Sequence, residues 1–309
     1  MKWKKLLPLI GIILFIYILV RIDVTNIFDE IVNANAFFLG ISVLMVGVLM
    51  AVQTFKWFVI ARKQKINVPF KEAFKINIIS NFYGFITPSK MGNILRAEYL
   101  KKYSKSFSKG VSNFVIDKIL DICSVFFLAI VFVFIYRNEF DFIPYNLFII
   151  FFILLVFMLI IFLKKERSKK ILKWFYRKLV PRKLKKKAKM GFESFYDNMP
   201  RKRDLVIFFI LNIINWIVTY FITYNIALSL GINLHFTYFL AILPVGTIIT
   251  LIPITVNGLG TREATLITLF SVFDIAPAKV VSMSLLALFI TGIIPGFFGI
   301  FFSIKPERD

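Results

Sequence analysis

The sequence is poor in the residues that most enzymes use at metal and redox sites, with one cysteine and one histidine among 309 residues. The single cysteine, Cys123, excludes an internal disulfide and a cysteine cluster. The single histidine, His235, argues against a histidine-based metal site and against a histidine-dependent catalytic triad. The phosphate-binding pattern G-x-x-x-x-G-K-[ST] of ATP-driven pumps is also missing. We therefore expect no cofactor, no metal and no catalytic residue.

Hydrophobic residues, in contrast, make up 59% of the chain, and 38 residues are phenylalanine. Soluble proteins contain only about 45–50% apolar residues. The apolar residues also form blocks near the roughly 20 residues that a helix needs to cross a bilayer. We expect an all-α polytopic membrane protein with about six full transmembrane helices. Their expected ranges are 6–20, 36–60, 112–136, 144–163, 205–230 and 280–303.

Acidic residues are outnumbered by 39 lysines and arginines, which gives a net charge of +22. In a soluble protein this excess indicates a nucleic-acid partner, but here 33 of the basic residues lie in five segments between or beside the apolar blocks. Because loops rich in lysine and arginine stay cytoplasmic, we expect a multi-pass cell-membrane protein with both termini in the cytoplasm. We expect no nucleic-acid partner. The five basic segments are 1–5, 61–75, 89–110, 164–204 and 304–309.

Two further apolar segments, 72–100 and 236–275, are interrupted by proline and glycine. Segment 72–100 has cytoplasmic charge on both flanks, and segment 236–275 lies between two external ends. We therefore expect each segment to enter the membrane and return on the same side, as a re-entrant helical hairpin. Irregular backbone at this depth is tolerated only where protein or water surrounds it, so the hairpins predict a cavity.

The chain then divides into two halves of opposite orientation, 6–163 and 205–303, each with a hairpin between two spans. We expect them to form one integral membrane domain, 1–303, with a basic cytoplasmic linker at 164–204. Both hairpin tips follow the order proline, glycine, arginine, acid. Interrupted segments at corresponding positions of inverted repeats are typical of transporter binding sites.

Arg96 and Arg262, one in each hairpin, are candidate binding residues because an arginine holds a phosphate group through two hydrogen bonds. Thr87 followed by Pro88 is a good start for a second half-helix. The N-terminus of such a half-helix projects partial positive charge into the membrane. Together these features predict a site for an anionic group between the hairpins.

A purely structural interpretation of the hairpins also remains open. In that case the prolines and glycines only kink helices, and the arginines snorkel or pair with the acids that follow them, Glu98 and Glu263. Charge inside a membrane segment is costly and is functional by default. The presence of two such hairpins in opposite orientation favours the functional interpretation.

Asp117 and Asp121 are four residues apart and therefore share one helix face. Functionally, they pair with Arg96 or carry a proton that couples transport. Structurally, they pair with Lys118 or Lys90 near the cytoplasmic surface. We favour a buried ion pair with an arginine.

Asn212, Asn215, Thr219 and Thr223 form a polar stripe at helical spacing. The stripe is either a track for a lipid headgroup or a set of interhelical hydrogen bonds worth about 0.6 kcal/mol each, and the two interpretations stand level. Lys56 lies near the cytoplasmic end of its span, where we expect its side chain to snorkel to the surface.

The linker 164–204 holds 17 basic and 4 acidic residues. Its apolar residues between 171 and 179 predict an amphipathic surface helix, which Pro181 ends. We expect this helix on the anionic inner leaflet, at about 1 kcal/mol per basic residue. The linker either recruits anionic lipid to the entrance or anchors the two halves, and we favour anchoring.

Three elements, in chain order, resemble the lysylphosphatidylglycerol synthase transmembrane region, a flippase-like (UPF0104-type) family of integral membrane proteins. The family's Pro-x-x-x-Gly-Glu-x-x-Arg element falls on Pro88, Gly92 and Arg96, with Asn93 in place of Glu. Its Asp-Arg-x-x-Asp element falls on Asp117 and Asp121, with Lys118 in place of Arg. Its Gly-Gly-x-Gly-x-Arg-Glu element falls on Gly258, Gly260, Arg262 and Glu263, with Asn257 in place of the first Gly.

The resemblance covers nearly the whole chain and implies a stand-alone member without the soluble aminoacyl-transferase domain. It implies transport of an anionic or phosphate-bearing lipid between leaflets: a phospholipid, an aminoacyl-phosphatidylglycerol or a polyprenyl-phosphate glycolipid. We take the residues of the three elements, together with Asn212 and Asn215, as candidate substrate-binding residues. Two alternatives stay open: an integral-membrane lipid transferase, and a non-transporting membrane partner of a synthase or glycosyltransferase.

Overall fold

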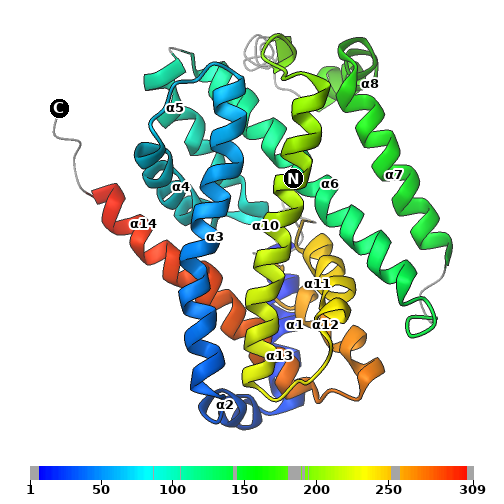
Figure 1. Ribbon diagram of the computed structural model, residues 1–309. Helices are drawn as coiled ribbons and strands as arrows, with labels where there is room; N and C mark the ends of the chain where they lie inside the picture. The colour runs from blue at the N-terminus through cyan, green and yellow to red at the C-terminus, as the bar shows by residue number, and fades with distance from the viewer. Residues whose placement is uncertain are drawn as a thin grey trace.

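The computed structural model describes residues 7–85, 87–104, 106–141, 145–179, 189, 192–193, 195–251 and 258–304. Over these residues the secondary structure is helical, without strands (Figure 1). Four helical runs are long and apolar enough to cross a membrane. The predicted all-α polytopic membrane fold is therefore confirmed. These runs are α3 (Ala36–Lys63), α6 (Phe107–Ile135), α10 (Lys202–Ser229) and the run of α13 (Pro277–Leu288), η6 (Phe289–Ile293) and α14 (Ile294–Ile304).

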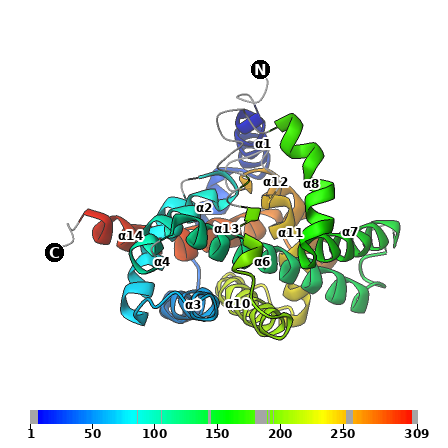
Figure 2. The ribbon, with the colours of Figure 1, turned by 90° about the horizontal axis from the view of Figure 1, so that it is seen from above.

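The remaining expected spans correspond to shorter apolar helices, α1 (Leu7–Ile22) and α7 (Tyr145–Leu163). Helix α7 lies at the edge of the molecule in both ribbon views (Figures 1 and 2). Its described side chains are mostly exposed and apolar, as suits a surface that faces lipid. A short helix, α2 (Val24–Val32), connects α1 to α3, and its first turn is capped by the Asp23 carboxylate, which accepts from Thr25 N–H.

Helices α3 and α10 form an antiparallel pair along one face of the fold (Figures 1 and 2). At one end of the pair, the backbone N–H of Asn35 donates to the carbonyl oxygen of Ser229 over 2.8 Å. At the other end, Lys63 Nζ lies 2.9 Å from Asp204 Oδ1. The end that holds Lys63 is also where the basic linker begins and ends, so the two ends of the molecule differ in charge.

The first hairpin is formed by α4 (Phe70–Phe85) and η2 (Pro88–Leu95), and it starts at the end where α3 finishes. Helix α5 (Arg96–Ser104) then leads back along the start of α6. The hairpin itself is as predicted, but its returning limb is a 3₁₀ helix instead of the expected α half-helix. The limb packs closely on α4, because a Cβ atom at Gly92 would overlap the carbonyl oxygen of Tyr83.

The second hairpin is formed by α11 (Phe236–Leu251) and α12 (Thr261–Phe270), which pack against each other. Residues 252–257, including Asn257, lie outside the described residues. Helix α11 starts just beyond the end of α10, at the opposite end of the molecule from the start of α4. The two hairpins therefore enter the fold from opposite ends. After α12, the short helix η5 (Ser271–Phe273) leads to α13.

Within the linker, the structure describes helix α8 (Lys165–Leu179), and Pro181 lies outside the described residues. The apolar side chains expected on one face of α8 are among those that the structure does not describe, apart from exposed Trp174. The last part of the linker packs on the charged end of the molecule. There Gln64 donates to the carbonyl oxygen of Asn198 over 3.0 Å, and Ser112 donates to that of Phe195 over 3.3 Å.

Candidate functional site

A cavity of about 250 Å³ lies in the middle of the fold, and both hairpins contribute to its lining. Arg96, which follows the first hairpin, and Arg262, in the second, both line it. The other walls come from α3, α6, α10, α13 and η6. Pockets that enclose whole small molecules measure about 300–1,000 Å³, so this cavity suits a polar headgroup better than an entire lipid.

Arg96 is buried at the start of α5, where it meets one carboxylate and two aromatic rings. Its Nη2 atom lies 3.0 Å from Asp117 Oδ2. Its guanidinium carbon lies 4.9 Å from the ring centroid of Trp57 and 5.9 Å from that of Phe114, distances at which cation–π attraction operates. Asp117 thus forms the predicted buried pair with an arginine. The Nε–H of Arg96 has no hydrogen-bond partner among the described residues.

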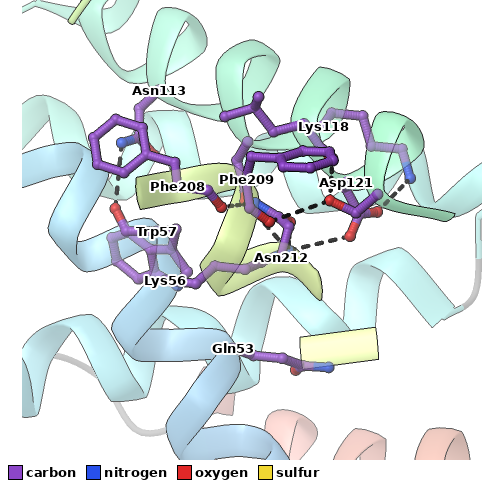
Figure 3. Close-up of polar contacts among 12 residues, drawn as sticks. Gln53, Lys56, Trp57, Asn113, Lys118, Asp121, Phe208, Phe209 and Asn212 are labelled. Carbon is purple, nitrogen blue, oxygen red and sulfur yellow. Dashed lines mark hydrogen bonds and ion pairs between the residues drawn. The ribbon is translucent and has the colours of Figure 1, made fainter. Parts of the chain in front are cut away.

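Lys56 lies at the centre of the charged cluster, and its ammonium group joins three helices (Figure 3). Its Nζ atom lies 3.3 Å from Asp117 Oδ1 and 3.2 Å from Asp121 Oδ1, and it donates to Asn212 Oδ1 over 2.7 Å. Only 8% of its side chain is exposed. The expected snorkelling of Lys56 is therefore wrong: the ammonium turns inward because two carboxylates of α6 offer it stronger partners.

Asp121 pairs with two lysines, so the arginine expected for this aspartate is wrong. Besides Lys56, Asp121 meets Lys118, whose Nζ lies 3.7 Å from Oδ2 (Figure 3). Glu98, which follows Arg96 in the chain, is exposed and pairs with Lys101 over 3.5 Å. Arg96 therefore pairs with an aspartate of α6, Asp117, and Glu98, two residues further along the chain, pairs with Lys101 instead.

The second hairpin presents Arg262, which is held by a fully buried carboxylate. Nη2 of Arg262 lies 2.8 Å from Glu263 Oε1, and Ser284 donates to the same oxygen over 2.7 Å. The other oxygen, Oε2, accepts the backbone N–H of Gly260 over 2.7 Å. Gly258 and Gly260 have φ angles of 78° and 82°, which suit glycine and form the turn that starts α12.

The charges around the cavity do not cancel. Among the described residues, four cations, Lys56, Arg96, Lys118 and Arg262, meet three carboxylates, so this group carries one net positive charge when all are ionised. The excess is set in walls of low dielectric, where electrostatic attraction is stronger than in water. The cavity therefore favours an anion.

The first hairpin is fixed by contacts within its own tip. Thr87 donates its hydroxyl to the carbonyl oxygen of Tyr83 over 2.8 Å and accepts the backbone N–H of Gly92 over 2.6 Å. Thr87 and Pro88 start η2 as expected, with Thr87 at the N-cap, but the Thr87 side chain makes no cap hydrogen bond to the first turn. Asn93 lines the cavity. The backbone of Pro88 opens η2, but its side chain lies outside the described residues.

Some residues of the polar stripe of α10 face the cavity, as a headgroup track would, and another makes an interhelical hydrogen bond. Asn215, Thr219 and Thr223 line the cavity, whereas Asn212 is buried beside it and holds Lys56. The two threonine hydroxyls bond carbonyl oxygens of their own helix. Besides the bond between Asn212 and Lys56, Tyr220 makes an interhelical hydrogen bond, since it donates to Thr247 Oγ1 over 3.1 Å.

Several cavity residues do not appear among the sequence candidates, which include neither Lys56 nor the polar residues of α4 and α11. Ser80 of α4 and Thr247 and Thr250 of α11 line the cavity. Single serines and threonines in apolar helices carry no distinctive signal. Lys56 did have a recognisable signal in the sequence, since a charge inside a membrane span is functional by default.

Comparisons with known proteins show which sequences this chain is similar to. The sequence model of the lysylphosphatidylglycerol synthase TM region matches residues 6–299. A UPF0104 membrane protein of Methanocaldococcus jannaschii is 23% identical, over 99% of this chain and 96% of its own length. A second, from Methanothermobacter thermautotrophicus, is 22% identical over 90% of this chain and 88% of its own length. A third, from Pyrococcus horikoshii, is 24% identical over 99% of this chain and 98% of its own length.

Proposed function

Because this chain belongs to the lysylphosphatidylglycerol synthase transmembrane-region family, we propose that it moves a phosphate-bearing lipid between the two leaflets of the cell membrane. The lipid headgroup enters the central cavity, while the acyl or prenyl chains stay in the bilayer. The observation that carries the proposal is the convergence of Arg96 and Arg262 on one cavity from hairpins that enter from opposite ends. A headgroup held there has a route to either side.

The two arginines act as alternate anchors for the phosphate in this proposal. Arg96 already shares its charge with Asp117, and Arg262 shares its charge with Glu263. The carboxylate beside each arginine weakens the attraction of that arginine for a bound anion. Each arginine therefore binds the phosphate weakly enough to release it, as a carrier must. The lipid moves down its gradient or with a coupled ion.

The basic end of the molecule is the cytoplasmic end in this proposal, with both termini on that side. Support comes from the basic loops, which include the end of α3, α5 and the linker with α8. Anionic lipids of the inner leaflet attract such segments. The first hairpin then starts from the side of the leaflet in which these lipids are most abundant.

The test is reconstitution of the purified protein into vesicles with fluorescent or radiolabelled phospholipids and polyprenyl phosphates. We expect Arg96→Ala and Arg262→Ala each to slow translocation by about 10- to 100-fold, because a charged hydrogen bond contributes about 1.5–3 kcal/mol. Arg62→Ala is the matched control, since Arg62 is exposed at the end of α3 and does not line the cavity. Thermal unfolding of each variant verifies that it is folded.

Translocation by both folded variants at the wild-type rate would overturn the assignment of the site. Formation of a new lipid product by the purified protein and a donor would favour a transferase instead. If the hairpin variants lost only the association with a synthase or glycosyltransferase, the protein would be a non-transporting partner.

A further inference from the structure

Six hydroxyl groups around the cavity share one property: their protons are already used. Each of the six donates to an oxygen of the protein, at distances of 2.7–3.3 Å. The hydroxyl of Ser80, which also lines the cavity, differs from them because it has no hydrogen-bond partner among the described residues. A hydroxyl that donates inside the protein still has oxygen lone pairs, so it faces a ligand as an acceptor. The six hydroxyls are those of Thr219, Thr223, Thr247, Thr250, Ser284 and Thr291. Such a lining matches a ligand that donates hydrogen bonds.

The carboxylates of the site, in contrast, are all engaged by cations. Asp117 lies against Arg96 and Lys56, Asp121 against Lys56 and Lys118, and Glu263 against Arg262. A ligand ammonium group would have to compete with these cations for its counter-charge. The ammonium group would also be repelled by the net positive charge of the cluster. Uncharged hydroxyl groups of a ligand are therefore better hydrogen-bond donors to the threonine oxygens.

The walls also contain unmet hydrogen-bonding capacity of both kinds. Arg96 Nε and Trp216 Nε1 are donors without partners among the described residues, and Asn93 Oδ1 and Asn215 Oδ1 are acceptors without partners. All four residues line the cavity. Their unpaired atoms are covered by neighbouring groups, so a ligand reaches them once side chains rotate. An acceptor such as phosphate and a donor such as a hydroxyl satisfy them together.

We propose that the cavity selects a lipid headgroup made of a phosphate followed by an uncharged, hydroxyl-rich group, such as glycerol or a sugar, over headgroups that present an amine. This inference rests on the proposed function for the identity of the ligand as a lipid. The phosphate lies toward the cationic cluster of Lys56, Arg96, Lys118 and Arg262. The hydroxyls lie toward the threonines of α10, α11 and η6.

The test is competition binding to the purified full chain with short-chain lipids that share the same acyl chains. Phosphatidylglycerol and phosphatidylserine have the same net charge, but the first presents hydroxyls where the second presents an ammonium and a carboxylate. We expect phosphatidylglycerol to bind about tenfold more tightly than phosphatidylserine, a factor that corresponds to one good hydrogen bond. Equal or tighter binding of phosphatidylserine would overturn the inference.

Two sources of the same chemistry are compared in the same assay. Phosphatidylglycerol supplies phosphate and glycerol, and a polyprenyl-phosphate hexose supplies phosphate and a sugar. Whichever of them binds more tightly identifies the source, and tight binding of either one supports the inference. Phosphatidic acid, which has the phosphate alone, should bind more weakly than both, and its binding as tightly as both would contradict a role for the hydroxyls.

Variants separate the hydroxyl contacts from the phosphate contacts. Thr219→Val and Thr291→Val keep the shape of the side chain and remove the acceptor, so phosphatidylglycerol should bind about three- to tenfold more weakly, whereas phosphatidic acid binding should not change. Thr268→Val is the control, since Thr268 donates the same bond to a carbonyl four residues back but lies outside the cavity. Equal losses for both lipids would overturn the inference.

Binding is measured here without translocation, so the two proposals fail separately. Selective binding of hydroxylated lipids without transport would overturn the transporter proposal and support the inference. Transport of amine-bearing lipids as fast as hydroxylated ones would support the transporter proposal and overturn the inference about the headgroup.

Discussion

At the residue scale, the cavity depends on Lys56, whose ammonium bridges α3, α6 and α10. Asp117 and Asp121 would otherwise be two like charges, four residues apart and largely buried. A buried pair adds little net stability over apolar residues, but the loss of one partner leaves an uncompensated charge. Lys56 therefore offsets part of the electrostatic repulsion between the two buried aspartates.

Replacement of Lys56 tests this role. We expect Lys56→Met to lower the free energy of unfolding by about 1–3 kcal/mol, because it removes the cation that the two aspartates share and leaves each aspartate with one cation, Arg96 or Lys118. Thermal or detergent-induced unfolding of the purified protein measures the change. Lys101→Met, which removes an exposed ion pair with Glu98, should change stability by less than about 1 kcal/mol.

The double variant Lys56→Met/Asp121→Asn gives the charge argument a second check. Removal of one carboxylate together with the lysine should restore part of the lost stability, because Asp117 and Asp121 no longer repel each other, while Lys118 is partly exposed and reaches water. A double variant less stable than Lys56→Met alone would contradict the role given to Lys56.

At the scale of elements, the geometry of the first hairpin depends on glycine. The limb η2 approaches α4 so closely that Gly92 has no room for a side chain beside Tyr83. Helices α5 and α6 meet with similar closeness, since a Cβ on Gly110 would lie 2.6 Å from the carbonyl oxygen of Ala97. Both contacts fix where Arg96 emerges into the cavity.

A single methyl group should therefore disturb the hairpin. We expect Gly92→Ala to destabilise the protein by about 1–3 kcal/mol through overpacking, and to lower lipid binding because Arg96 moves. Gly47→Ala in α3 is the control: nothing lies within 4 Å of its Cβ position, and alanine favours a helix by up to about 1 kcal/mol over glycine. If both variants had the same free energy of unfolding, the close approach of η2 to α4 at Gly92 would not contribute to stability.

At the scale of the whole molecule, the order of a long helix, a hairpin and a second long helical run occurs twice, once from α3 to α6 and once from α10 to α14. Helices α3 and α10 correspond and run antiparallel, and each precedes a hairpin that starts from its own end of the molecule. This arrangement places the ends of the two hairpins against one cavity. We expect the same opposition across the membrane.

Labelling of single cysteines with a membrane-impermeant reagent measures the orientation. In a Cys123→Ser background, Glu98→Cys should react from the cytoplasmic side and Ser271→Cys from the outside, in inverted vesicles and intact cells respectively. Both positions are exposed. The unaltered chain is the control, since Cys123 is fully buried and should not react from either side. Reaction of both cysteines from one side would contradict the opposed orientation.

Sequence reasoning succeeds here where the signal is local or repeated. The long apolar runs predicted the spans, and the interrupted segments predicted both hairpins. The pair of Arg96 and Asp117 followed from the rule that buried charges need partners. The position of Lys56 could not be predicted in this way, because its partner Asp121 lies 65 residues away and only the packed fold brings the two together.

The 3₁₀ limb and the π-helical segment η6 were also beyond the sequence. Their hydrogen-bond patterns follow from how tightly neighbouring helices approach, as at Gly92 and Tyr83, and not from residue propensity. The acceptor character of the cavity threonines depends on the same packing, since it requires each hydroxyl to find a carbonyl within the fold.

The π-helical segment η6 gives the last span a sensitivity to chain length. A π turn holds one residue more than an α turn, and the helix that follows, α14, packs on α4 through glycines. At Gly299, a Cβ would lie 2.9 Å from the carbonyl oxygen of Ile78. Deletion of one residue within 289–293 would leave an uninterrupted apolar helix, yet it would turn α14 by about 100° and direct bulky residues at α4. Insertions and deletions in this span should therefore be tolerated less well than exchanges among its lipid-exposed apolar residues, such as Phe289 and Phe297.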